Sequence, residues 1–263
     1  MHAVVGHDFG SPVAAWCALT RPDVFRSVVM MSAPFGGPPD AHHWSATHAA
    51  QSQEVNALAQ LSPPRQHYQW YYSDRQANED MWHPPQGLHA FLRAYYHVKS
   101  ADWSPNQPHP LSAWRADVLA ELPHYYVMPA GQTMAQAVAP HMPNAAETAQ
   151  CRWMPDAHLQ VYTQEYQRRG FQGGLQWYRC ATEHDQWGVL SRWGGQTIRV
   201  PSAYWAGQAD WGIYQFPGAF EKMKAQVCED MRFCELLPHA GHWVQQEQPG
   251  LVNQKLLQFL GSL

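Results

Sequence analysis

The segment Gly6-His7-Asp8-Phe9-Gly10 places a carboxylate in a setting where it could act as a nucleophile. It stands between an expected strand over residues 2–6 and an expected helix over 11–20, as in a nucleophile elbow. The flanking glycines are expected because side chains there would clash. A carboxylate nucleophile suits displacement at a strained epoxide carbon or a carbon that bears halide. The alternative interpretation is a glycine-rich turn in which Asp8 only caps the helix.

Two more ionisable residues follow expected strands in the C-terminal part. Asp210 follows the strand over 200–206, and His242 follows the strand over 233–237. Sites in open α/β sheets form beyond the carboxyl ends of strands, so Asp8, Asp210 and His242 are expected to meet in the order nucleophile, acid, base. His239 is the competing base, but Gly241-His242 with a helix after it fits the base loop better.

The elements that must position these residues form two regions. Short buried strands over 2–6 and 27–32, with the helix over 11–20 between them, predict an α/β fold with a mostly parallel sheet flanked by helices. The same pattern returns at 200–206, 217–227, 233–237 and 246–260. Residues 36–195 lack strand–helix alternation and include helical stretches over 86–98 and 157–169. We therefore expect a core of 1–35 and 196–263 and an inserted helical cap of 36–195.

Five segments together resemble the epoxide hydrolases of the α/β-hydrolase fold, over essentially the whole chain. They are VVGHDFG, HYQWYYS, GFQGGLQWYR, AGQADWGIYQFPGA and AGHWVQQEQP. The resemblance implies that Asp8, Asp210 and His242 are catalytic and that the cap tyrosines are Tyr68 and Tyr178. It implies opening of an epoxide to a vicinal diol through a covalent aspartyl ester, with the Phe9 backbone N–H at the oxyanion and no cofactor.

Tyrosine suits the cap position on chemical grounds. Epoxide opening develops an alkoxide, and a phenol is a neutral donor near neutral pH that can hydrogen-bond or protonate it. Without the resemblance, aromatic packing would be the expected role of Tyr68 and Tyr178, because the chain has 12 tyrosines.

Two alternative functions stay open at this stage. A haloalkane-type dehalogenase would use the same triad, but such enzymes normally carry Trp after the Asp, and Phe9 has no N–H donor in its side chain. A truncated, non-catalytic homologue would bind a ligand without turnover.

The resemblance also implies that the chain is N-terminally incomplete. It begins on the nucleophile strand, so the first strands of the core and an HGxP segment that completes the oxyanion hole are expected to be absent. A fragment, a misplaced start or a degenerate homologue would each give this pattern.

Composition excludes several other classes. The net charge is −4, which excludes a broadly basic nucleic-acid binder or a polybasic membrane anchor. No apolar run is long enough to span a membrane, and the N-terminus lacks signal-peptide features. Five scattered cysteines suit a reducing cytoplasm, and the 16 histidines lack metal-site spacing. We expect a cytoplasmic enzyme without metal that acts on a small apolar epoxide and water, and that can form a homodimer.

Overall fold

The computed structural model describes residues 2–40, 42–183 and 188–263. The chain divides into two compact units. The core unit comprises Met1–Ala41, Ser104–Ser112 and Leu190–Leu263, and the cap unit comprises His42–Trp103 and Ala113–Val189. The expected cap of 36–195 stays a prediction, and it differs from the cap unit chiefly in the segment Ser104–Ser112.

The core unit contains a parallel four-stranded sheet. Its strands are β1 (Ala3–His7), β2 (Ser27–Met31), β5 (Ser202–Gly207) and β6 (Met231–Leu237), in the order β1-β2-β5-β6. Every residue of β2 and β5 is buried, as expected for parallel strands that are covered on both faces. The predicted α/β class is therefore confirmed, and each strand lies within two residues of its expected bounds.

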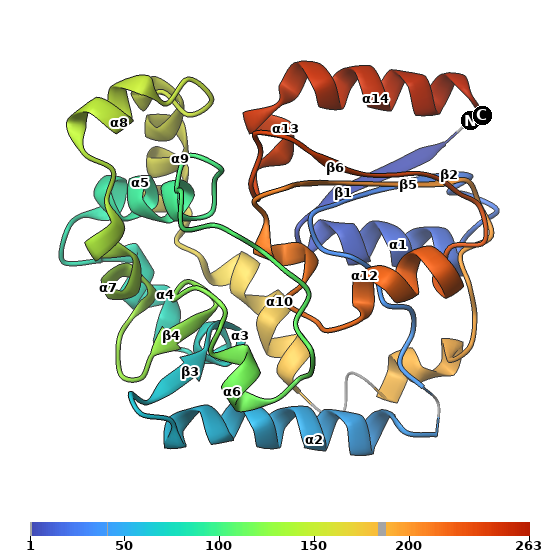
Figure 1. Ribbon diagram of the computed structural model, residues 1–263, viewed down its shortest axis with the longest axis horizontal. Coiled ribbons are helices and arrows are strands. Elements are labelled where there is room, and N and C mark those ends of the chain that lie inside the picture. Colours follow the sequence, from blue (N-terminus) through green and yellow to red (C-terminus); the bar gives the residue numbers. More distant parts are fainter. Residues whose placement is uncertain (1, 41, 184–187) are drawn as a thin grey trace. The chain divides into compact units, whose positions relative to one another are not determined.

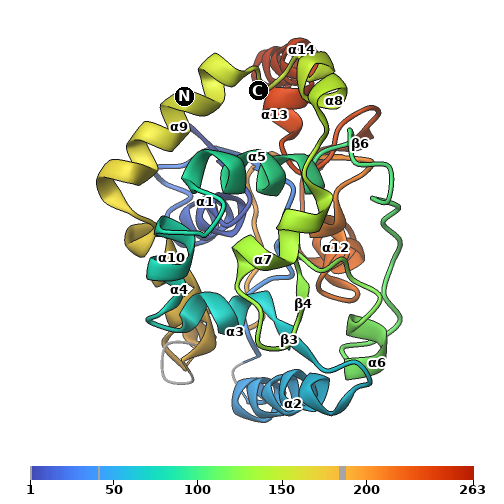
Figure 2. The same cartoon turned by 90° about the vertical axis from the view of Figure 1, so that its left-hand side faces the viewer.

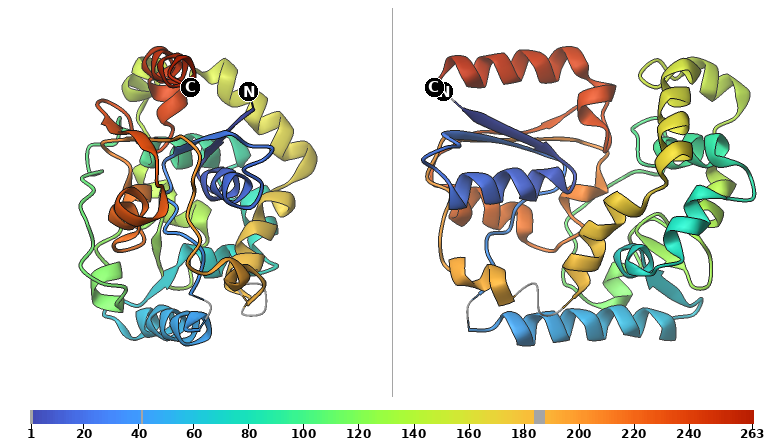
Figure 3. Two further views of the ribbon diagram at one scale, coloured as in Figure 1. Left: turned by 90° about the vertical axis from the view of Figure 1, so that its right-hand side faces the viewer. Right: turned by 180° about the vertical axis from the view of Figure 1, so that it is seen from behind.

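Helices cover both faces of this sheet (Figures 1 and 3). α14 (Pro249–Gly261) lies on one face, and α1 (Gly10–Thr20) and α12 (Ala219–Lys222) lie on the other. Alternate β2 residues enter the two cores, because neighbouring side chains of a strand point to opposite faces. Val28 packs in the cluster beneath α1, and Val29 packs in the cluster that contains Phe259 of α14.

The C-terminal helical region departs from the sequence prediction. One helix was expected over 246–260, but the structure has α13 (Val244–Glu247) followed by α14, which begins at Pro249. Proline lacks an N–H and favours the first position of a helix, so Pro249 starts a new helix instead of continuing α13. The helix expected over 217–227 consists of α12 followed by a π-helical turn, Met223–Val227.

The cap unit is mainly helical, with one small ribbon of two strands (Figure 2). Its helices are α2 (Trp44–Ala57), α3 (Tyr68–Ser73), α4 (Ala77–Trp82), α5 (Leu88–Val98), α6 (Ala116–Leu119), α7 (Met134–Val138), α8 (Ala145–Gln150), α9 (Asp156–Arg169) and α10 (Gln172–Thr182). The ribbon pairs β3 (Arg65–His67) with β4 (Val127–Pro129) in antiparallel register. Three-residue strands are too short to show a period of two, so sequence patterning missed them. No helix in the described part of the chain has the length and apolarity needed to cross a membrane.

Candidate active site

The turn between β1 and α1 holds Asp8 in a strained backbone conformation. Asp8 has a φ of 54°, in the left-handed region that residues with a side chain rarely adopt. A Cβ at Gly6 would overlap the carbonyl oxygen of Gly10, so position 6 requires glycine, as predicted. A Cβ at Gly10 would meet no atom within 4 Å, so the expectation of a clash at Gly10 was wrong.

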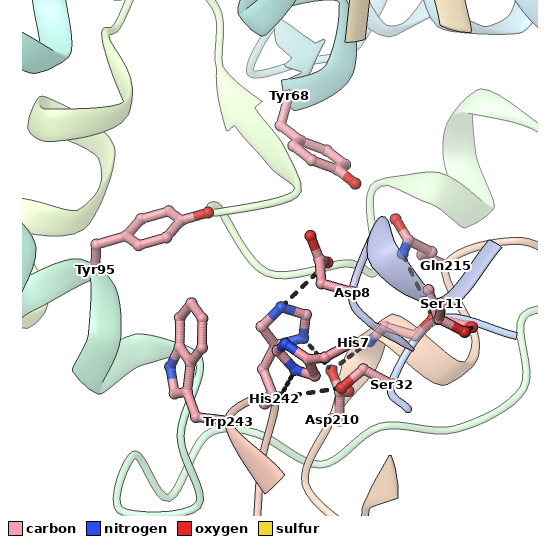
Figure 4. Close-up of polar contacts among 12 residues, drawn as sticks. His7, Asp8, Ser11, Ser32, Tyr68, Tyr95, Asp210, Gln215, His242 and Trp243 are labelled. Atoms are coloured by element: carbon pink, nitrogen blue, oxygen red, sulfur yellow. Dashed lines mark hydrogen bonds and ion pairs between the residues drawn. The ribbon is translucent and has the colours of Figure 1, made fainter. Parts of the chain in front are cut away.

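His242 lies between the two carboxylates (Figure 4). Its Nε2 is 3.2 Å from Asp8 Oδ1, and its Nδ1 is 3.2 Å from Asp210 Oδ1. The side chains of His242 and Asp210 are 2% and 1% exposed, whereas that of Asp8 is 29% exposed. His239, the competing base in the sequence, is exposed to solvent. The structure therefore brings Asp8, Asp210 and His242 together, with Asp8 as the member that solvent and small molecules can reach.

Asp210 is positioned to stay ionised. Burial alone would raise the pKa of this carboxyl, but the charge of His242 and the hydrogen bond with it hold the pKa below its usual value. The backbone N–H of Gly212 also donates to Asp210 Oδ1, at 2.7 Å. An ionised Asp210 fixes the orientation of the His242 ring and stabilises its protonated form.

The backbone of His242 is held as well as its ring. Its carbonyl oxygen accepts from His7 Nε2 at 2.6 Å and from Ser32 Oγ at 3.0 Å (Figure 4). Burial lowers the pKa of His7 to about 4, helped by the nearby charge of His242, so His7 is neutral at neutral pH. Sequence reasoning missed His7 and Ser32 because each acts on a residue more than 200 positions away. The available signal was their position at the carboxyl ends of strands: His7 is the last residue of β1, and Ser32 directly follows β2.

Phe9 stands at the N-terminus of α1, as its N-cap residue. Phe9 is 40% exposed. The free N–H groups and macrodipole of a helix N-terminus favour negative charge, which suits an ionised Asp8 one residue earlier. The predicted role of the Phe9 backbone N–H at an oxyanion stays a prediction.

Tyr68 and Tyr178 lie side by side within the cap unit. Their ring centroids are 5.7 Å apart, with the rings inclined at 72°. Tyr68 is buried at the start of α3, and Gln69 Nε2 donates to its hydroxyl oxygen at 3.2 Å. α3 and α10 are joined by hydrogen bonds from Arg179 and Thr182 of α10 to Ser73. The two predicted tyrosines thus share one rigidly connected corner of the cap unit.

Tyr72 belongs to the same aromatic cluster. Its ring centroid is 4.9 Å from that of Tyr178, and its hydroxyl donates to the Tyr95 hydroxyl at 3.4 Å. Burial raises the pKa of Tyr72 well above its usual value, so it stays a neutral phenol. The sequence offered no reason to separate Tyr72 from packing tyrosines.

Among the residues that the structure describes, no group of three or more His, Cys, Asp or Glu side chains could hold a metal ion. The fold and the site together define a class of protein. A parallel sheet with helices on both faces, an aspartate at the elbow after a strand, and an Asp–His pair after later strands are the features of an α/β hydrolase.

Comparisons with known proteins narrow this class. Epoxide hydrolase B of Mycobacterium tuberculosis is 29% identical over 276 residues, which cover 99% of this chain and 72% of that protein. Epoxide hydrolase A of the same organism is 39% identical over 111 residues, 42% of this chain and 33% of that protein. Among solved structures, an epoxide hydrolase from an endophytic Streptomyces matches with a TM-score of 0.74 at 26% identity. The match covers 98% of this chain and 67% of the Streptomyces chain. No protein-family model matches the chain.

The chain is a homologue of the epoxide hydrolases of the α/β-hydrolase fold. These comparisons do not favour the dehalogenase alternative.

Proposed function

We propose that the chain hydrolyses an epoxide to a vicinal diol through a covalent ester on Asp8. The observation that carries this proposal is the placement of His242 between the exposed carboxylate of Asp8 and the buried carboxylate of Asp210. A carboxylate at the elbow can attack carbon, and the His–Asp pair beside it can activate water against the resulting ester. The homology to epoxide hydrolases supports the same reaction.

The first step is alkylation of Asp8. A carboxylate oxygen of Asp8 attacks one epoxide carbon, and the bond between that carbon and the epoxide oxygen breaks. Tyr68 and Tyr178 donate hydrogen bonds to the departing oxygen, and one of them gives it a proton. The products of this step are a hydroxyalkyl ester on Asp8 and one tyrosinate.

The second step is hydrolysis of the ester. His242, oriented by Asp210, takes a proton from water, and the water oxygen attacks the carbonyl carbon of the Asp8 ester. The backbone N–H of Phe9 stabilises the oxyanion that forms. The bond to the diol oxygen breaks, His242 returns its proton to that oxygen, and the Asp8 carboxyl returns a proton to the tyrosinate. The oxygen atom of the water remains in the carboxyl group of Asp8.

The substrate is proposed to be a small apolar epoxide, because the chain is rich in aromatic side chains, with 13 Trp and 12 Tyr. A cytoplasmic location is proposed from the free cysteines, which suit a reducing compartment. A homodimer is proposed as the assembly.

Intact-protein mass spectrometry after incubation with an aryl epoxide such as styrene oxide tests the mechanism. The His242→Gln variant should gain one substrate mass and stall, because alkylation needs Asp8 and hydrolysis needs His242. Asp8→Asn should gain no mass, and the double variant should behave like Asp8→Asn. A folded His242→Gln protein that gains no mass would contradict the mechanism. Halide release from a haloalkane would instead favour the dehalogenase reaction, and ligand binding without a diol would favour a non-catalytic homologue.

A further inference from the structure

The short loop that carries His242 is held from outside the triad by Glu247. The carboxylate of Glu247, in α13, accepts from the backbone N–H of Gly241 through both oxygens, at 3.0 Å each. Oε1 also accepts from the backbone N–H of Trp243 at 3.0 Å. The two amides that flank His242 in the chain are thus bound by one side chain.

The other side of the loop is equally fixed. The carbonyl oxygen of His242 accepts from His7 and Ser32, as described above. A Cβ at Gly207, the last residue of β5, would overlap the carbonyl oxygens of Ala240 and Gly241. The loop therefore packs directly on the β5 backbone, while Glu247 holds its amides.

This arrangement matters because the His242 ring must satisfy two distances at once. Nε2 and Nδ1 each lie 3.2 Å from a carboxylate oxygen. The ring position follows from the position of the His242 Cα, since the side chain has only two rotatable bonds. A misplacement of about 1 Å in an active site can cost about a hundredfold in rate.

We propose that Glu247 is a positioning residue for His242: its carboxylate fixes the backbone on both sides of the histidine and so places the imidazole between Asp8 and Asp210. This inference rests on the function proposed above and assigns Glu247 to one step of it. Glu247 acts through His242, so it affects hydrolysis of the ester and leaves alkylation of Asp8 unchanged.

Replacement of Glu247 by alanine or glutamine separates this role from general stability. Glu247→Ala removes all three hydrogen bonds. Glu247→Gln keeps an oxygen that can accept from both Gly241 and Trp243 but loses the second acceptor and the charge. Glu221→Ala is the matched control, because Glu221 is an exposed carboxylate on α12 of the same unit.

Single-turnover experiments with styrene oxide, followed by quenched intact mass spectrometry, measure the two rates separately. In Glu247→Ala the ester should form at the wild-type rate. Its hydrolysis should be slower than in the wild type by a factor of about ten or more, so the ester accumulates. In Glu247→Gln the decay should lie between those of Glu247→Ala and the wild type, and Glu221→Ala should match the wild type. Far-UV circular dichroism of each variant establishes that it is folded.

The outcomes separate the inference from the proposed function. A wild-type protein that forms neither ester nor diol overturns both. A wild-type protein that turns over, with a Glu247→Ala ester that decays at the wild-type rate, overturns the positioning role alone. Equal slowing of both steps in Glu247→Gln and Glu247→Ala would show a structural effect and also overturn it. If Glu247→Ala does not fold, the two rates of Glu247→Gln decide.

Discussion

Gly6 and Gly10 lie on either side of Asp8 in the chain, and substitution by alanine is expected to have opposite effects at the two positions. Gly6→Ala places a Cβ on the backbone of Gly10, so the elbow must open and Asp8 must move. Gly10→Ala meets open space at the first position of α1, where alanine favours the helix by about 0.5–1 kcal/mol. We expect Gly6→Ala to abolish alkylation of Asp8 and Gly10→Ala to keep it.

Mass spectrometry with an epoxide and a thermal melt check both variants. An active Gly6→Ala protein would mean that the close approach of residues 6 and 10 is not required. An inactive but folded Gly10→Ala protein would mean that position 10 has a role beyond backbone geometry.

The cap tyrosines lead to a second prediction at the scale of single residues. Two phenols donate to one departing oxygen in the proposed mechanism, so either can partly replace the other. Tyr68→Phe and Tyr178→Phe should each slow alkylation by about tenfold, which corresponds to the loss of one hydrogen bond of about 1.4 kcal/mol.

The double variant Tyr68→Phe/Tyr178→Phe should lose far more than the product of the two single effects, because no proton donor is left. Pre-steady-state measurement of ester formation provides the rates. Single variants with wild-type rates, together with an active double variant, would contradict a role for both hydroxyls.

At the scale of elements, α3 depends on a buried histidine at its N-terminus. His67 Nδ1 accepts from the backbone N–H of Gln69 at 3.3 Å and so acts as the N-cap of the helix that carries Tyr68. Burial lowers the pKa of His67 to about 3. Between pH 6.5 and 3 the unfolded chain therefore binds one more proton at this position than the folded chain, and folding becomes less favourable as the pH falls.

His67→Asn keeps an N-cap oxygen but has no titratable group. As the pH falls below about 6.5, the free energy of unfolding should decrease less steeply in the variant than in the wild type. The two slopes should differ by about 1.4 kcal/mol per pH unit. Urea titrations at pH 7, 6 and 5 measure the slope. Parallel slopes for the two proteins would mean that His67 is protonated in the folded state.

Much of the core unit could be predicted from the sequence, because strands that are covered on both faces of a sheet are recognisable as short, nearly continuous apolar runs. The run over 28–31 is apolar throughout, and the glycine at position 6 marks a turn that only glycine can make. The β3–β4 ribbon and the contacts of His7 and Ser32 with His242 could not be predicted, because they depend on which distant segments pack together. The split between α13 and α14 is different, because Pro249 is a local signal for it.

At the scale of the whole molecule, one edge of the sheet is open to association. Within the described residues β1 pairs with β2 alone, and Val5 of β1 is 45% exposed. An edge strand with an exposed apolar side chain is a template for pairing with another chain. We expect the 263-residue chain to self-associate through β1.

Val5→Lys should shift size-exclusion and light-scattering profiles towards the monomer, because charge on an edge strand opposes pairing. Val161→Lys is the matched control, since Val161 is 58% exposed on α9 of the cap unit. A monomeric wild-type chain, or an equal effect of both substitutions, would contradict association through β1.

The pairing of β2 with β5 has a consequence for the order in which the chain folds. Met31 pairs with Trp205, so the central strand pair of the sheet joins two segments that are separated in the chain by the whole cap unit. Closing a long loop costs conformational entropy, and contacts between residues far apart in sequence are associated with slower folding. During synthesis β1, α1 and β2 emerge before the cap unit, and the whole cap unit emerges before β5, the strand with which β2 pairs. Asp8, which follows β1, is therefore synthesised before the cap unit, whereas the sheet that supports its elbow gains its central strand pair only after β5 has emerged.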